Sequence, residues 1–266
     1  MSDAFLTNQD DRGVLTISLN KPNIHNAFDD QLITSLTEYI NKLENDASVR
    51  LILLKGEGKS FCAGADLNWM KRMKNYSADE NYADSLALAG LFHAINNFRG
   101  PVIGKVHGAA LGGGSGLVAV CDYVLAKENT VFGFTEVVLG LAPAVISPFV
   151  MAKIGESNAR AYFLSGERFG TSQAIKMGLI HQVALDRYFN QDVEEVITTF
   201  LKAGPSAQRK VKELIFGVQE FSRENQAMVT DYTCKTISSI RTSEEGQEGM
   251  TALLDKRKPN WQTTTK

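Results

Sequence analysis

Hydrophobic residues in the first half of the chain follow two spacings, one typical of strands and one typical of helices. Every second residue from Leu15 to Leu19 is apolar, which predicts a strand with one buried face. Apolar residues then recur every three or four positions over 32–43, which predicts a helix that Asp29 or Asp30 can cap. The uninterrupted apolar run 51–54 predicts a strand covered on both faces. These elements form a βαβ unit.

Predicted strands and helices continue to alternate along the chain. The pattern predicts a helix over 83–98, a strand over 102–106, a glycine-rich turn, a further helix and a strand over 123–126. Helices dominate after Ser157, and an amphipathic helix is predicted from Ser206 to Phe221. We therefore expect an α/β core over 1–200 and a helical region over 201–266 that covers the core or mediates oligomerisation.

Composition narrows the class of protein. The 266 residues carry a net charge of -2, with 44% hydrophobic and 22% charged residues, so charge gives no reason to expect a nucleic-acid or membrane partner. The three cysteines are widely spaced and lack the pattern of a zinc or disulfide framework, so no metal is expected and Cys62 and Cys121 are interpreted as packing residues. Met1–Asp11 does not resemble a signal peptide, and the apolar run 137–152 is too short and too broken to span a bilayer. A cytoplasmic protein is expected.

Two segments rich in small residues follow predicted strands and precede predicted helices. They are Ser60–Leu67 and Gly108–Gly116. Small side chains let a ligand approach the backbone, and N–H groups at a helix start favour a negative oxygen, although ordinary tight turns have the same composition. The second segment matches neither a P-loop nor GxGxxG, which disfavours nucleotide binding. Together the two loops could direct one N–H each at a carbonyl oxygen and so form an oxyanion hole.

A single carboxylate, Glu136, interrupts the otherwise apolar segment 132–140. Burial raises the pKa of a carboxyl group and suits it to exchanging protons near neutral pH. The alternative is a structural carboxylate that accepts hydrogen bonds from nearby backbone N–H groups.

Short motifs follow one another in a fixed order along nearly the whole chain. They are Asn20-Lys21-Pro22, Asn26-Ala27, Phe61–Leu67, His107-Gly108, Gly112–Gly114, Cys121-Asp122, Phe132-Gly133 with Glu136, Leu139-Gly140, Ala174, Gly178-Leu179 and Lys256–Asn260. This ordered set resembles the crotonase (enoyl-CoA hydratase/isomerase) superfamily. Within that superfamily, the segments 66–73, 116–119 and 143–148 are most similar to bacterial methylglutaconyl-CoA hydratases of leucine breakdown and to carboxygeranoyl-CoA hydratases.

This resemblance implies a fold, a partner and roles for named residues. The expected fold is a crotonase-like spiral of ββα repeats, assembled into homotrimers or hexamers, and the expected partner is an acyl-CoA thioester that brings the coenzyme A itself. Ala65 and Gly113 match the two N–H donors for the thioester oxygen, and Glu136 matches an acid/base. For the substrate, the resemblance implies contacts from His25, Ala27, Ala63, Asp66, Leu67, Asn68, Gly116 and Lys258.

Gly116 departs from the pattern of the superfamily, because enoyl-CoA hydratases carry the first of two glutamates at this position. The leading hypothesis is hydration of 3-methylglutaconyl-CoA by Glu136, with Gly116 clearing space and charge for the carboxylate of the substrate. The alternatives are a Δ3,Δ2-enoyl-CoA isomerase that uses Glu136 alone, a short-chain enoyl-CoA hydratase, and an acyl-CoA-binding protein without turnover.

Overall fold

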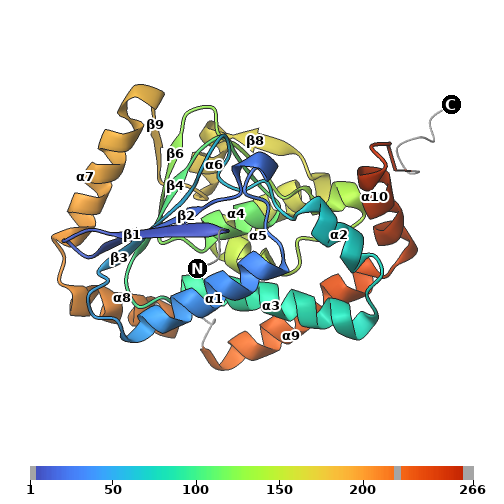
Figure 1. The fold of residues 1–266 in the computed structure, drawn as a ribbon, viewed down its shortest axis with the longest axis horizontal. Helices are drawn as coiled ribbons and strands as arrows, with labels where there is room; N and C mark the ends of the chain where they lie inside the picture. Colours follow the sequence, from blue (N-terminus) through green and yellow to red (C-terminus); the bar gives the residue numbers. More distant parts are fainter. Residues whose placement is uncertain (1–3, 219–222, 260–266) are drawn as a thin grey trace.

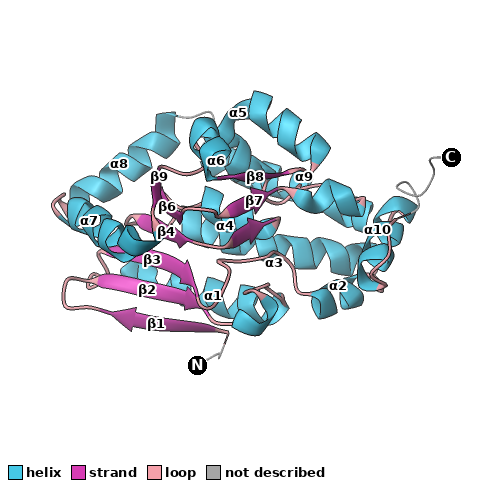
Figure 2. Ribbon diagram, turned by 90° about the horizontal axis from the view of Figure 1, so that it is seen from above, coloured by secondary structure: helices cyan, strands magenta, loops and turns pink. Residues whose placement is uncertain are grey.

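A twisted six-stranded sheet organises the chain (Figure 1). The structure, a computed structural model, describes residues 4–218 and 223–259. The first two strands are antiparallel and the other neighbouring pairs are parallel, with the first strand at the sheet edge (Figure 2). In spatial order the strands are β1 (Phe5–Gln9), β2 (Val14–Leu19), β3 (Leu51–Gly56), β4 (Val102–Val106), β6 (Tyr123–Lys127) and β9 (Gln182–Ala184).

Strand β3 is buried on both faces of this sheet, as the apolar run 51–54 predicts. Leu51 and Leu53 of β3 belong to a smaller apolar cluster that includes residues of α7 (Phe189–Leu201). Ile52 and Leu54 belong to the main core on the opposite face. Because side chains alternate along a strand, a continuous apolar run serves two cores at once.

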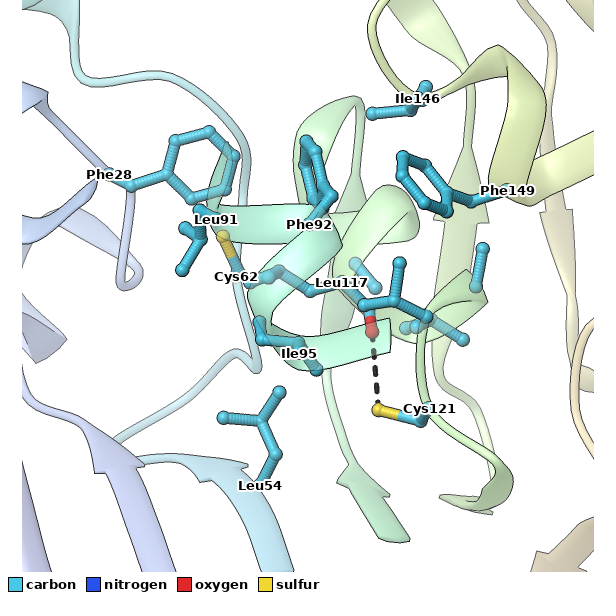
Figure 3. Close-up of a cluster of buried hydrophobic side chains, with 14 of the residues drawn as sticks. Phe28, Leu54, Cys62, Leu91, Phe92, Ile95, Leu117, Cys121, Ile146 and Phe149 are labelled. Carbon is cyan, nitrogen blue, oxygen red and sulfur yellow. Dashed lines mark hydrogen bonds between the residues drawn. The ribbon is translucent and has the colours of Figure 1, made fainter. Parts of the chain in front are cut away.

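The main core is covered by most of the helices. Side chains from distant segments, among them Phe28, Leu54, Leu91 and Ile95, meet within it (Figure 3). Besides α7, the described helices are α1 (Asp30–Lys42), α2 (Leu67–Met73), α3 (Ala78–Asn96), α4 (Gly113–Ala119), α5 (Ser147–Ser165), α6 (Thr171–Met177), α8 (Pro205–Val218), α9 (Arg223–Arg241) and α10 (Glu244–Leu254). The 3-10 turns are η1 (Pro22–Ile24), η2 (Leu43–Asn45), η3 (Thr135–Leu139) and η4 (Asp186–Tyr188).

Local sequence signals account for several element boundaries. The Asp29 carboxylate accepts a hydrogen bond of 3.0 Å from the Leu32 N–H, which confirms one of the two predicted caps for α1. Cys62 and Cys121 are buried free thiols whose pKa burial raises to about 12, in agreement with a packing role. The Cys121 Sγ donates to the Leu117 carbonyl at 3.2 Å (Figure 3).

The C-terminal helices lie against the core. Helix α9 lies beside α3 (Figure 1), where the Tyr82 hydroxyl donates to Asp231 at 2.6 Å and the Ser238 hydroxyl donates to the Ala78 carbonyl at 2.7 Å. The predicted amphipathic helix is α8, which begins at Pro205, and the last residues of that prediction, 219–221, lie outside the described residues. Across residues 4–218 and 223–259, no helix combines the length and the apolar character needed to cross a bilayer.

A smaller three-stranded sheet joins the glycine-rich segment to the segment that precedes Glu136. It contains β5 (Ala109–Leu111), β7 (Val131–Gly133) and β8 (Arg168–Gly170) in the order β5-β7-β8. Strand β5 immediately precedes α4, and β7 immediately precedes the turn that carries Glu136. This sheet therefore places the glycine-rich segment and the isolated carboxylate side by side.

Candidate active site

Backbone pairing joins the two small-residue segments at Cys62 and Ala110. Cys62 pairs with Ala110 in parallel: its N–H donates to the Ala109 carbonyl at 3.0 Å, and its carbonyl accepts from the Leu111 N–H at 3.1 Å. Ala65 and Gly113 lie three residues beyond these partners on each segment. Both residues line one cavity, so the two predicted donors lie on the same site.

The N–H groups of Ala65 and Gly113 have no acceptor within the described residues. Phe28 pairs with the neighbours of Ala65: its N–H donates to the Gly64 carbonyl and its carbonyl accepts from the Asp66 N–H, each at 2.9 Å. Since alternate residues of an extended segment point to opposite sides, the Ala65 N–H points away from Phe28. Gly113 is the first residue of α4, where an N–H has no partner inside the helix. Two backbone donors are thus available to a ligand oxygen.

Glycine is required where the two small-residue segments approach each other and Phe28. A Cβ atom at Gly114 would lie 2.1 Å from the Cys62 carbonyl oxygen, and one at Gly113 would lie 2.3 Å from Cζ of Phe28. Gly64 has φ of 99°, a conformation that side chains with Cβ rarely adopt. The small residues in these segments therefore hold two backbones together, which an ordinary turn does not require.

Glu136 lies in η3, with its carboxylate against the backbone of Gly112. A Cβ atom at Gly112 would be 3.3 Å from the Glu136 Oε1. The Oε2 atom is buried and has no hydrogen-bond partner in the described part of the chain. Burial raises the pKa of Glu136 from its ordinary value of 4.5 to about 7, against a smaller opposing effect of its own backbone N–H. A structural carboxylate would have both oxygens bonded, so the geometry favours a functional one.

The raised pKa predicts that Glu136 lowers the free energy of unfolding as the pH rises above about 4.5. The folded-state pKa lies above the unfolded value, so the favourable contribution is complete below about pH 4.5 and is lost as the pH rises through about 7. Between about pH 4 and pH 8, the wild type should lose about 3 kcal/mol of unfolding free energy relative to Glu136→Gln. Urea unfolding of both proteins across this range measures the difference. Parallel pH profiles would show that the carboxyl group is hydrated.

A cavity of about 460 Å³ extends from the two N–H groups. Its wall is largely apolar, and among the described lining residues Glu136 is the one carboxylate, while Arg168 and Arg241 are the two cations. The wall also contains Phe28, Ala63, Gly64, Ala65, Leu67, Trp69, Met70, Met73, Leu88, Leu111, Gly112, Gly113, Thr135, Val138, Leu139, Leu141, Ala142, Pro143, Ala144, Val145, Ile146, Gly166, Ile237 and Leu253. An apolar cavity with a few converging polar groups is typical of a small-molecule site.

The C-terminal helices form part of this wall. A Cβ atom at Gly249 of α10 would lie 1.6 Å from the Leu139 carbonyl oxygen, so α10 packs directly on η3. Ile237 of α9 and Leu253 of α10 line the cavity. The helical region therefore supports the turn that carries Glu136.

Comparison with known proteins identifies the family. The family model described as Enoyl-CoA hydratase/isomerase matches residues 9–264. This chain belongs to that family. Its crotonase-like α/β fold with a helical C-terminal region, expected from the sequence, is confirmed.

Individual members of the family match over almost their full length. A crystal structure of an enoyl-CoA hydratase from Shewanella pealeana is 36% identical with a TM-score of 0.77, covering 97% of this chain and 96% of that chain. A mevalonyl-coenzyme A hydratase from Aspergillus fumigatus is 31% identical over 93% of this chain and 91% of its own. A 2,3-dehydroadipyl-CoA hydratase from Escherichia coli is 29% identical over 98% of this chain and 99% of its own.

The structure brings some of the predicted site residues to the cavity and leaves others outside it. Ala63, Ala65, Leu67, Gly113 and Glu136 lie on the wall. Five other predicted residues, His25, Ala27, Asp66, Asn68 and Lys258, do not line the cavity. The Asp66 carboxylate caps α2 by accepting from the N–H groups of Asn68 and Trp69 at 2.8 and 3.0 Å, and the His25 Nδ1 lies 3.0 Å from the Ser60 hydroxyl. Ala27 is buried, whereas Asn68 and Lys258 are exposed. A role for these five residues in binding coenzyme A stays a prediction.

Gly116, where the family carries its first glutamate, does not line the cavity. A Cβ atom there would lie 2.4 Å from Cγ2 of Ile146 and 3.0 Å from the Phe92 ring. Phe92, Ile146 and Phe149 gather at this end of the core, with the two rings 5.8 Å apart (Figure 3). The expectation that Gly116 clears space for a substrate group is therefore corrected, because apolar side chains fill that space.

Gly116→Ala should destabilise the protein by about 1–3 kcal/mol, because the added methyl group overpacks the core. Gly90→Ala is the matched control, since a Cβ at Gly90 meets nothing within 4 Å. Adding Ile146→Val to Gly116→Ala should not restore stability, because valine keeps the Cγ2 atom, whereas Ile146→Ala should restore part of it. Urea denaturation measures each variant, and equal stability of the Gly116 and Gly90 variants would contradict this packing.

Two cavity residues, Arg168 and Arg241, were not predicted. Arg168 lies on a short strand and Arg241 at the end of a helix. The available signal was the spacing of Ile237 and Arg241, which are four residues apart and so lie on one face of α9. Sequence alone does not show which face of that helix meets the cavity.

Proposed function

We propose that this protein catalyses the reversible addition of water to the Cα–Cβ double bond of an enoyl-CoA thioester. One observation carries the proposal: the unpartnered carboxylate of Glu136 shares a cavity with the unpaired N–H groups of Ala65 and Gly113. Membership of the enoyl-CoA hydratase/isomerase family supports it. The proposed reaction needs no cofactor beyond the coenzyme A of the substrate.

The proposed steps use one carboxylate twice. The thioester oxygen accepts hydrogen bonds from Ala65 and Gly113, which stabilise the negative charge that develops on it. Ionised Glu136 takes a proton from water as the water oxygen bonds to Cβ, and the electrons of the double bond move toward the thioester oxygen to form an enolate. Glu136 then delivers the proton to Cα, which regenerates the thioester carbonyl and the ionised carboxylate. Overall, one water is added.

The proposed substrate is 3-methylglutaconyl-CoA, an enoyl-CoA with a branched Cβ and a distal carboxylate. The resemblance of segments 66–73, 116–119 and 143–148 to methylglutaconyl-CoA hydratases supports this choice. Two relatives each support one of these features. The name of one specifies a dehydroadipyl-CoA, which carries a distal carboxylate, and the name of the other specifies a mevalonyl-CoA, which is branched at Cβ and carries a distal hydroxyl group instead. A place in leucine breakdown and assembly into trimers or hexamers belong to the same proposal.

A second candidate, movement of the double bond, is favoured by the single carboxylate on the cavity wall. A carboxylate can carry a proton between two carbons without any water being added. The absorbance of the conjugated thioester separates the candidates. Incubation with 3-methylglutaconyl-CoA should lower this absorbance, whereas an isomerase given a β,γ-enoyl-CoA would raise it. No change with either thioester would leave only binding and would contradict the proposed hydration.

A further inference from the structure

Arg241 is a buried cation on an otherwise apolar part of the cavity wall. Only 6% of its surface is exposed, and it lines the cavity together with Trp69, Ile237 and Leu253. An arginine is rarely buried to this degree unless it is paired. The hydrogen bonds that Arg241 makes within the protein therefore show which of its N–H groups remain available to a ligand.

The guanidinium uses one nitrogen for its protein contacts. Nη1 donates to the Asp84 Oδ2 at 2.9 Å and to the Ser85 hydroxyl at 3.1 Å. The other carboxylate oxygen of Asp84 accepts from the Trp69 indole N–H at 3.0 Å, so Asp84 is held from two sides. Within the described residues, Nε and Nη2 of Arg241 have no acceptor, and neither nitrogen is completely buried. Since Arg241 lines the cavity, the space beside these nitrogens is the cavity.

We propose that Arg241 binds a carboxylate at the distal end of the acyl group and so selects substrates that carry one. This inference rests on the proposed function. A guanidinium can bind carboxylates along two edges, and Asp84 occupies one of them. The apolar surroundings strengthen a charge-assisted hydrogen bond because little water competes for the donors. The ligand class is an acyl-CoA with a terminal carboxylate.

Arg168 is the alternative cation on the wall. It lies on β8, is exposed, and has no ion pair within the described part of the chain. Water solvates an exposed guanidinium, so a carboxylate gains less from binding there than at Arg241. Arg168 therefore serves as the comparison in the experiment.

Removing Arg241 alone would leave Asp84 buried without its cation, which would both destabilise the protein and repel a substrate carboxylate. The test variant is therefore the double substitution Arg241→Met with Asp84→Asn, which removes both charges. Asp84→Asn alone is the matched control, because it keeps the guanidinium. Arg168→Met tests the alternative cation.

The readout is the affinity for two saturated thioesters, glutaryl-CoA and butyryl-CoA, which differ only by the terminal carboxylate and cannot be hydrated. Calorimetry should show that the wild type prefers glutaryl-CoA. The double variant should lose about 10- to 100-fold of this preference, with butyryl-CoA affinity changed by less than about threefold. Asp84→Asn and Arg168→Met should keep it.

The inference is overturned if the double variant retains the preference, if Asp84→Asn loses as much of it, or if Arg168→Met alone abolishes it. An equal loss of affinity for both thioesters would assign Arg241 a structural role and also overturn it. Hydration of crotonyl-CoA and of 3-methylglutaconyl-CoA by the wild type is followed separately. If the binding preference holds while no enoyl-CoA is hydrated, the proposed function fails and the carboxylate site stands.

Discussion

Replacing Glu136 by Gln should lower kcat by roughly 10² to 10⁴ while thioester affinity stays within several-fold, the usual scale for the loss of a positioned acid or base. The amide keeps the shape of the side chain but neither takes a proton from water nor returns one to Cα. Because Glu136 is the one carboxylate among the described lining residues, no neighbouring acid can replace it. The exposed Glu167→Gln is the matched control and should behave as the wild type.

The same group should set the pH dependence of the reaction. Hydration begins with ionised Glu136, whose pKa is raised to about 7 by burial, so kcat/KM should fall as the pH drops below that value. The reverse reaction also begins with the ionised carboxylate, which takes the proton from Cα, so its kcat/KM should fall below the same pH. Glu136→Gln should remove both dependences. Near-normal turnover of Glu136→Gln would return Glu136 to the structural interpretation.

Gly114→Ala should lower kcat/KM by about 10² to 10³, the scale seen when one oxyanion donor is lost. Neither N–H of the pair can be deleted by exchanging a side chain, but their separation can be changed. A Cβ at Gly114 would lie 2.1 Å from the Cys62 carbonyl oxygen, so the two paired segments must move apart. That movement increases the distance between the N–H groups of Ala65 and Gly113, so that they no longer bind the same oxygen.

Gly90→Ala is again the control, because it adds the same methyl group to a helix with no contact within 4 Å. Circular dichroism and urea unfolding establish that the Gly114 variant is folded at the assay temperature. Steady-state kinetics then compare the two variants. Full activity of a folded Gly114→Ala protein would show that the spacing of the two N–H groups does not control the reaction.

The sequence predicted those features that depend on local patterns. The period of apolar residues gives the strand at 51–54 and its two buried faces, and the Asp29 cap follows from the side chain at a helix start. The two small-residue segments and Glu136 stand out because each breaks the composition around it. The structure then brings these three features to one cavity.

The remaining features of the site depend on packing between residues that are distant in the sequence. Nothing near Gly116 in the sequence indicates that Ile146 and Phe92 fill the space beside it. Arg241 is the last residue of a helix whose sequence pattern predicts a partly exposed surface. Its hydrogen-bond partners, Asp84 and Ser85, lie more than a hundred positions away in the sequence. Which side chain fills a given space depends on tertiary contacts that periodicity does not encode.

The most direct test of hydration by Glu136 is the mass of the product formed from 3-methylglutaconyl-CoA in heavy-oxygen water. The wild type should give a thioester that has gained one water and carries the heavy oxygen on Cβ, and Glu136→Gln should form this product at least about 100-fold more slowly. A product of unchanged mass with a moved double bond, or labelled product formed equally fast by both proteins, would contradict the account.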